Sequence, residues 1–238
     1  MAPMRTGKKQ MAQIFPKWTN EIPKIAPPVV LIIGAIATFA GWYWGGPKHT
    51  DVGYQPKQPI AYSHKLHAGD LGMDCRYCHT YVEQGPHAGV PPTQTCMNCH
   101  AHVKTDSAKL APLRQSWATG KAIKWLRVHK IPDYAYFDHS AHMNIAQGKA
   151  AVGCKTCHGR IDQMVTVSQV EPLSMGWCLE CHRSIREESG ETFAAWRIRP
   201  KNEITNMLWE PDTKWETEAE KIRTTLRPPT VECSGCHR

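Results

Sequence analysis

Five copies of the pattern Cys-x-x-Cys-His use every cysteine in this 238-residue chain. In chain order they are Cys75–His79, Cys96–His100, Cys154–His158, Cys178–His182 and Cys233–His237, here called sites 1 to 5. The pattern is typical of c-type haem attachment, in which the thiols bond the vinyl groups and the adjacent imidazole binds iron. The attaching residues are Cys75, Cys78, Cys96, Cys99, Cys154, Cys157, Cys178, Cys181, Cys233 and Cys236, and the proximal ligands are His79, His100, His158, His182 and His237.

Zinc ribbons and disulfide frameworks are the alternative interpretations of paired cysteines. Neither needs a histidine after each pair. With 13 His in 238 residues, a histidine follows a given pair by chance about once in twenty, so five together arise less than about once in a million. The sequence therefore predicts five covalent haems.

The motifs belong to an internal repeat. An aromatic-x-His-x-x-His pattern precedes site 1 at Tyr62–His67 and site 3 at Phe137–His142, and two motifs follow each copy. Cys75, Cys154 and Cys233 are each 79 residues apart, so site 5 begins a third, truncated unit. Where that unit should have its histidine pair, residues 215–218 contain none.

Length and composition restrict the fold and the partners. Leaving aside the N-terminal apolar segment, about 40 residues remain per haem, too few for separate protein cores. We expect haems to form the core of a loop-rich fold with short helices, including helices near 110–126 and 213–226. The net charge of +8 does not indicate nucleic-acid binding, because residues 1–28 hold five Lys or Arg against one Glu and haem propionates offset the rest.

Residues 25–44 are uncharged and long enough to cross a bilayer. Trp18 and the Trp42–Trp44 cluster are placed for the two interfaces, and Lys and Arg precede the segment. This predicts a single-pass anchor in a bacterial inner membrane with the haem domain on the periplasmic side. A cleaved signal peptide is the alternative, with Ala35–Ala37 as cleavage triplet, but the stretch before the apolar core is long for one.

The expected organisation has five parts. They are a cytoplasmic segment (1–24), a transmembrane helix (25–44), a Gly/Pro-rich tether (45–61), a first dihaem unit (62–130) and a second unit with three haems (131–238).

The aromatic-x-His-x-x-His and Cys-x-x-Cys-His arrangement resembles the small multihaem cytochromes of the c3/c7 group. The resemblance implies that the first histidine of each pair serves the following haem and the second serves the next. The implied axial pairs are His64 with His79, His67 with His100, His139 with His158, and His142 with His182. A zinc pair or surface histidines are the alternative interpretation of the His-x-x-His pattern.

Site 5 has no histidine pair of its own. In the c7 pattern such a haem takes a ligand just upstream of the preceding motif, which here is Met175. Met164, His129 and His102 are the alternatives, and His87 is an unused candidate in the first unit. A thioether ligand raises a haem's potential relative to two imidazoles.

The stretch 125–183, the anchor and the five motifs together resemble the pentahaem membrane-anchored cytochrome subunit of alternative complex III. The resemblance implies an electron-transfer subunit of a respiratory or photosynthetic quinol oxidoreductase, not an enzyme on its own. Implied partners are an iron–sulfur-like subunit, polytopic quinol-binding subunits, a monohaem cytochrome c and a soluble carrier such as a cytochrome or copper protein.

Two other functions are weighed against this one. A stand-alone membrane-anchored quinol dehydrogenase places its first motif close after the anchor with a nearby methionine, whereas Cys75 lies about thirty residues beyond the anchor and Thr80–Val82 offers no Met. A multihaem reductase, such as one acting on nitrite, needs an open iron position, and the spare His and Met residues leave none required.

Overall fold

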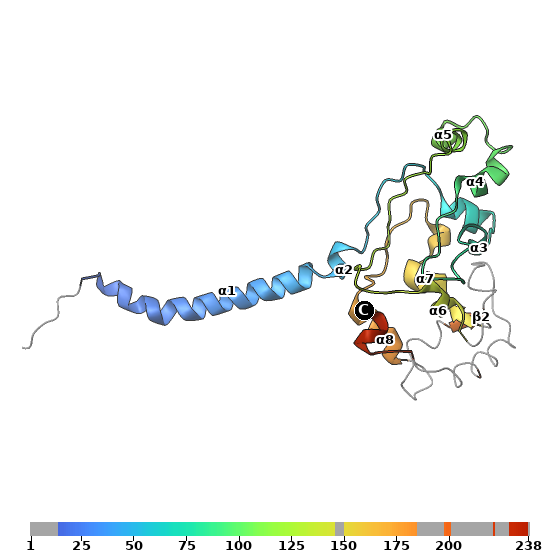
Figure 1. Cartoon of the computed structure of the whole chain (residues 1–238). Coiled ribbons are helices and arrows are strands. Elements are labelled where there is room, and N and C mark those ends of the chain that lie inside the picture. Colours follow the sequence, from blue (N-terminus) through green and yellow to red (C-terminus); the bar gives the residue numbers. More distant parts are fainter. Residues whose placement is uncertain (1–13, 146–149, 185–197, 201–220, 222–228, 238) are drawn as a thin grey trace, which may run out of the picture. The chain divides into compact units, whose positions relative to one another are not determined.

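The structure is a computed structural model, and it describes residues 14–145, 150–184, 198–200, 221 and 229–237. The chain divides into two compact parts, Met1–His49 and Thr50–Arg238. The first contains one long helix, whereas the second contains short helices joined by loops (Figure 1). The expected segment around 213–226 and the residues 215–218 lie outside the described residues, apart from Lys221. The division of the haem-bearing part at 130/131 stays a prediction.

The N-terminal part is built around α1 (Ile22–Trp44), which follows a 3₁₀ turn, η1 (Lys17–Glu21). Pro23 lies in the first turn, where a missing N–H costs no helical bond. Its 23 residues rise about 34 Å, enough for a hydrocarbon core of about 30 Å. In the described residues this helix alone has the length and apolar composition needed to cross a membrane, and it contains no buried residue.

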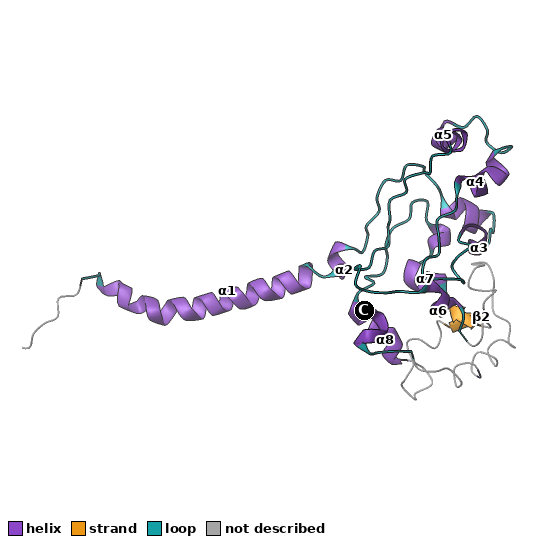
Figure 2. Ribbon diagram, in the orientation of Figure 1, coloured by secondary structure: helices purple, strands orange, loops and turns teal. Residues whose placement is uncertain are grey.

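The described helices of the haem-bearing part have only three to ten residues. Loops connect nearly all of them (Figure 2). The expectation of a loop-rich fold with short helices is confirmed. In chain order the elements are α2 (Pro47–Thr50), η2 (Lys65–Asp70), α3 (Cys75–Cys78), α4 (Thr93–His100), η3 (Ala108–Leu110), α5 (Ala111–Thr119), α6 (His139–Met143), β1 (Ala150–Val152), α7 (Cys154–His158), η4 (Ile161–Gln163), α8 (Met175–Ser184), β2 (Ile198–Pro200) and α11 (Cys233–Cys236).

The two described strands, β1 and β2, form an antiparallel pair in which Ala151 lies opposite Arg199. Few apolar side chains are buried in the described residues. They are Ile60, Val82, Leu113, Met143 and Ala151. Val82, Met143 and Ala151 form one cluster between the two repeats, with Ala88 and Cys154 packed against it. A core this small does not stabilise a part of this length by apolar burial alone.

The helix expected at 110–126 is shorter in the structure. α5 ends at Thr119 because Gly120 adopts a left-handed conformation with φ of 68°. The following segment is extended, and the Gln58 side chain binds both backbone groups of Leu126 at 2.9 and 2.8 Å. The apolar residues of this segment therefore do not continue the helix.

The two repeats pack against each other reciprocally. The backbone N–H of Lys65, in the first repeat, donates to the carbonyl of Met164, just after site 3, at 3.0 Å. Gly69 permits this approach, since a Cβ there would collide with the carbonyl oxygen of Asp162. In return, the N–H of Ser140 donates to the carbonyl of Gly85, just after site 1, at 3.2 Å.

Replacing Gly69 with alanine should separate η2 from η4. We expect Gly69→Ala to lower the free energy of unfolding by about 1–3 kcal/mol, as overpacking at a close contact does. Thermal melting of the haem-loaded protein, followed at the Soret band, measures the change. Gly85→Ala is the matched control, because a Cβ there meets no atom within 4 Å. Equal melting of both variants would contradict the close packing of the repeats.

Candidate haem sites

A helix forms at each Cys-x-x-Cys-His motif. It contains the two cysteines, and the histidine lies at or near its end. α3 begins after Asp74, whose carboxylate accepts the N–H of Arg76, and α7 begins after Gly153. The motif histidine is the last helical residue or the next one in sites 1, 2, 3 and 5, and α8 continues two residues past it in site 4. All five motifs therefore lie on helices, although Cys99 of site 2 and Cys233 of site 5 are exposed.

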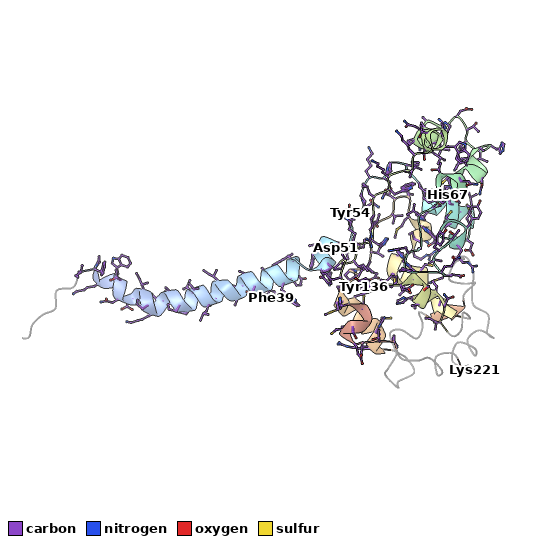
Figure 3. All side chains as sticks on the ribbon, in the orientation of Figure 1. Phe39, Asp51, Tyr54, His67, Tyr136 and Lys221 are labelled. Atoms are coloured by element: carbon purple, nitrogen blue, oxygen red, sulfur yellow. The ribbon has the colours of Figure 1, made fainter. Side chains whose placement is uncertain are left out.

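Four motif histidines face a histidine from a His-x-x-His pair. The ring centres are 6.5 Å apart for His64 and His79, 6.3 Å for His67 and His100, 6.4 Å for His139 and His158, and 6.2 Å for His142 and His182. His67 is labelled in Figure 3. These are the pairings that the c3/c7 resemblance implies.

The spacing of these rings fits a metal held between two imidazoles. A metal–nitrogen distance of about 2 Å places two ring centres that share one metal roughly 6 Å apart. Direct stacking of rings occurs at shorter separations, so these pairs leave room for a third group. The buried Nδ1 of His64 has no hydrogen-bond partner, as in a site built around a group other than its own side chains. The donor set and its spacing fit c-type haem.

Hydrogen bonds from Nδ1 to backbone carbonyl oxygens orient most of these rings. The Nδ1 atoms of His79, His100 and His182 lie 2.6, 3.0 and 2.7 Å from the carbonyl oxygens of Gly89, Val103 and Thr230. A carbonyl accepts only, so Nδ1 carries the hydrogen and Nε2 keeps its lone pair for a metal. Four other histidines likewise donate from Nδ1 to a backbone carbonyl oxygen: His67 to Ser63, His139 to Pro86, His142 to Asp138 and His237 to Tyr134.

Burial keeps several of these imidazoles neutral. Desolvation, with the neighbouring His79, lowers the pKa of His64 to about 4. Desolvation, with His129 close by, lowers the pKa of His158 to about 3. Desolvation also lowers the pKa of His142. At neutral pH these rings are unprotonated, which is the form that binds iron.

Site 5 is held against the start of the second repeat. The N–H of Tyr136, labelled in Figure 3, donates to the carbonyl of Cys236 at 2.8 Å, and Ala135 forms a β-bridge with His237. Met175 begins α8 and its side chain is 66% exposed. Its role as the distal ligand stays a prediction. His87 and His102 are exposed and face none of the motif histidines.

The position of His129 in the structure differs from any expected from its sequence context. Its Nε2 lies 3.3 Å from Nδ1 of His158, with the rings at 77°. When Nε2 of His158 is the metal ligand, its Nδ1 carries the hydrogen and His129 accepts it. His129 thus lies behind the site 3 histidine, although it was considered as a ligand for site 5. A lone histidine outside the repeated pattern is the one sequence signal that marks it.

The zinc and disulfide interpretations find little support in the geometry. In the described residues no three or more His, Cys, Asp or Glu side chains gather where they could hold a metal ion directly. All ten cysteines lie in that part of the chain, and the structure places none in a disulfide.

Removing the His129 acceptor should affect site 3 selectively. We expect His129→Phe to cost about 1 kcal/mol of stability, since the Nδ1 donor of His158 loses its partner. It should also raise one midpoint potential, because a less basic imidazole stabilises ferric iron less. A spectroscopic redox titration and a melting curve measure both effects.

Two variants complete the His129 experiment. His129→Gln keeps an acceptor oxygen and should restore the potential, and His87→Phe makes the same change at an exposed position. A potential that stays unchanged in His129→Phe would exclude a role for this hydrogen bond.

No protein-family model matches the chain. The chain is 36% identical over 124 residues to a protein of Nitratidesulfovibrio vulgaris (strain Hildenborough) named menaquinone reductase, multiheme cytochrome c subunit. The match covers 52% of this chain and 54% of the relative, so the chain spans about half the relative's length. The relative is thus a multihaem cytochrome c subunit by its name, and the match does not single out alternative complex III.

Proposed function

We propose that this chain is the electron-transfer subunit of a membrane quinone-linked oxidoreductase and holds five c-type haems. The observation that carries the proposal is the set of four facing imidazole pairs, each 6.2–6.5 Å between ring centres. In this proposal those pairs are the axial ligands of sites 1 to 4, and His237 and Met175 are those of site 5.

A bound haem with two axial ligands supplies a one-electron Fe(III)/Fe(II) couple. The chain's own residues fix that couple in place, since the thiols anchor the group and the carbonyls on Nδ1 orient the imidazoles. If these residues filled both ligand positions of each iron, no position would be left for a substrate such as nitrite. This favours electron relay over a reductase.

The membrane reaction belongs to partners in this proposal. Oxidising one quinol to quinone releases two electrons and two protons, and single-electron carriers accept the electrons one at a time. The chain offers one apolar helix, α1, which can contribute part of a quinol site. Polytopic quinol-binding subunits, an iron–sulfur-like subunit and a monohaem cytochrome c are the proposed neighbours, with a cytochrome or copper protein as soluble acceptor. The anchor lies in the bacterial inner membrane and the haem part on the periplasmic side.

The direction of electron flow separates two versions of this function. The resemblance to the alternative complex III subunit favours flow from quinol to a carrier. The printed name of the Nitratidesulfovibrio relative, a menaquinone reductase subunit, favours flow toward menaquinone as the second candidate. Both versions use the same ligands, so the potentials of the haems and the identity of the partners decide between them.

Quinol oxidation by the isolated and the assembled chain tests the proposal. We expect the purified, haem-loaded chain to be reduced by dithionite and reoxidised by a soluble cytochrome, yet to oxidise quinol negligibly. Turnover should appear in the intact complex, in the direction of quinol to carrier. Quinol turnover by the monodisperse chain alone would favour the anchored quinol dehydrogenase instead, and turnover of the complex only toward menaquinone would favour the second candidate.

Met175 provides a separate prediction on site 5. We expect Met175→Ala to abolish a near-infrared methionine–iron charge-transfer band, and Met175→His to lower the potential of one haem, since two imidazoles give a lower potential than His/Met. Met164→Ala is the control, because Met164 is the other methionine considered for this site. Loss of the band in Met164→Ala, with the band kept in Met175→Ala, would move the ligand to Met164.

A further inference from the structure

The spatial order of the five sites differs from their order in the sequence. In the sequence, site 2 precedes site 3 and would be expected to adjoin it. The contacts of the haem-bearing part instead place site 1 against site 3.

The junction between the repeats lies at sites 1 and 3. His139, which faces the site 3 histidine, lies with Nδ1 2.7 Å from the carbonyl of Pro86, in the loop that follows site 1. The Asn144 side chain donates to the carbonyl of Glu83 in the same loop at 2.8 Å. From the other side, Lys65, next to His64, binds the carbonyl of Met164 beyond site 3. The histidine pair of each repeat thus packs against the other repeat's first site.

The small apolar core lies at the same junction. Val82 follows site 1, Met143 follows the second histidine pair, and Cys154 of site 3 packs against their cluster. Three kinds of contact, from backbone, side chain and core, therefore join sites 1 and 3.

Site 2 lies beside site 1. Tyr62 contacts both His64 and His67, with ring centres 4.8 and 4.5 Å apart, and these histidines face sites 1 and 2. The Asn98 side chain, within the site 2 motif, donates to the Tyr77 hydroxyl within the site 1 motif at 3.0 Å. The helix of site 2, α4, packs against α5, with Thr93 and Ser116 hydroxyls 2.7 Å apart.

Sites 4 and 5 extend from site 3. Phe137 contacts His139 and His142 as Tyr62 contacts its own pair, at 4.8 and 4.6 Å, so sites 3 and 4 are neighbours. The Nδ1 of His182, in site 4, donates to the carbonyl of Thr230, and Gly235 of site 5 lies directly against Thr230. Site 5 therefore adjoins site 4.

We infer that the sites form a row in the order 2–1–3–4–5, with sites 2 and 5 at its ends. This inference rests on the haem ligation proposed above. It means that partners exchange electrons with the chain at sites 2 and 5, and that site 1, although first in the sequence, is internal. Site 2 and site 3 are separated by site 1.

Magnetic coupling between neighbouring haems tests this order without any turnover. His139→Met raises the potential of site 3, so the full haem-loaded chain can be poised with site 3 reduced and diamagnetic and the other bis-imidazole sites ferric. Electron paramagnetic resonance at that potential then reports which ferric signals lose their fast relaxation. His64→Met and His67→Met identify the signals of sites 1 and 2 by the change each causes.

The row predicts that reducing site 3 lowers the relaxation enhancement of the site 1 signal, which keeps only the part due to site 2, and leaves the site 2 signal unchanged. If the site 2 signal lost relaxation enhancement and the site 1 signal did not, sites 2 and 3 would be neighbours, as they are in the sequence, and the row would be overturned. Equal loss at both sites, or at neither, would also overturn it.

A second variant keeps the test open if His139→Met does not assemble. In His67→Met, with site 2 reduced, we expect the relaxation enhancement to fall at site 1 alone, whereas a fall at site 3 would contradict the row. Because neither measurement uses quinol or a carrier, a chain that fails the quinol experiment still decides the order.

Discussion

The facing imidazoles are the constraint on which the haem-bearing part depends. Four pairs of rings lie 6.2–6.5 Å apart between centres, a separation too wide for direct ring contact and suited to one metal between them. The described residues bury few apolar side chains. In the proposed function, haem held between the imidazoles would supply the interior that side chains do not, and the loops would need only to cover it. This explains why helices as short as four residues suffice in this part of the chain.

Local spacing made much of this arrangement predictable. Cys-x-x-Cys-His fixes the attachment chemistry within five residues, and two histidines three residues apart project from one turn toward different neighbours. The c3/c7 resemblance therefore implied pairings, such as His64 with His79, that are also the facing pairs in the structure. Their role as ligands is a proposal, because facing rings describe geometry and not ligation.

Features that depend on tertiary packing were beyond the sequence. The apolar residues up to Leu126 extended the expected helix, but Gly120 ends it, and Gln58 from a distant loop binds the freed backbone. The His129 side chain meets its partner, His158, outside its own segment, so nothing local indicated this position. The contact between one repeat and the other's first site likewise depends on backbone carbonyls, such as that of Pro86. Because every residue has a backbone carbonyl, the sequence does not mark these contacts.

Docking of the repeats and orientation of the ligands use the same hydrogen bonds. The contact of His139 with Pro86 both holds the His139 ring, whose centre lies 6.4 Å from that of His158, and ties the second repeat to the first. His64 is the equivalent residue in the first repeat, and its buried Nδ1 has no partner. An imidazole whose Nδ1–H has no acceptor is a weaker base at Nε2 than one whose Nδ1–H donates to a carbonyl oxygen. The duplicated repeat therefore places two chemically unequal sites at its centre, and this inequality arises from packing between the repeats, since both histidines occupy the same position in the repeated pattern.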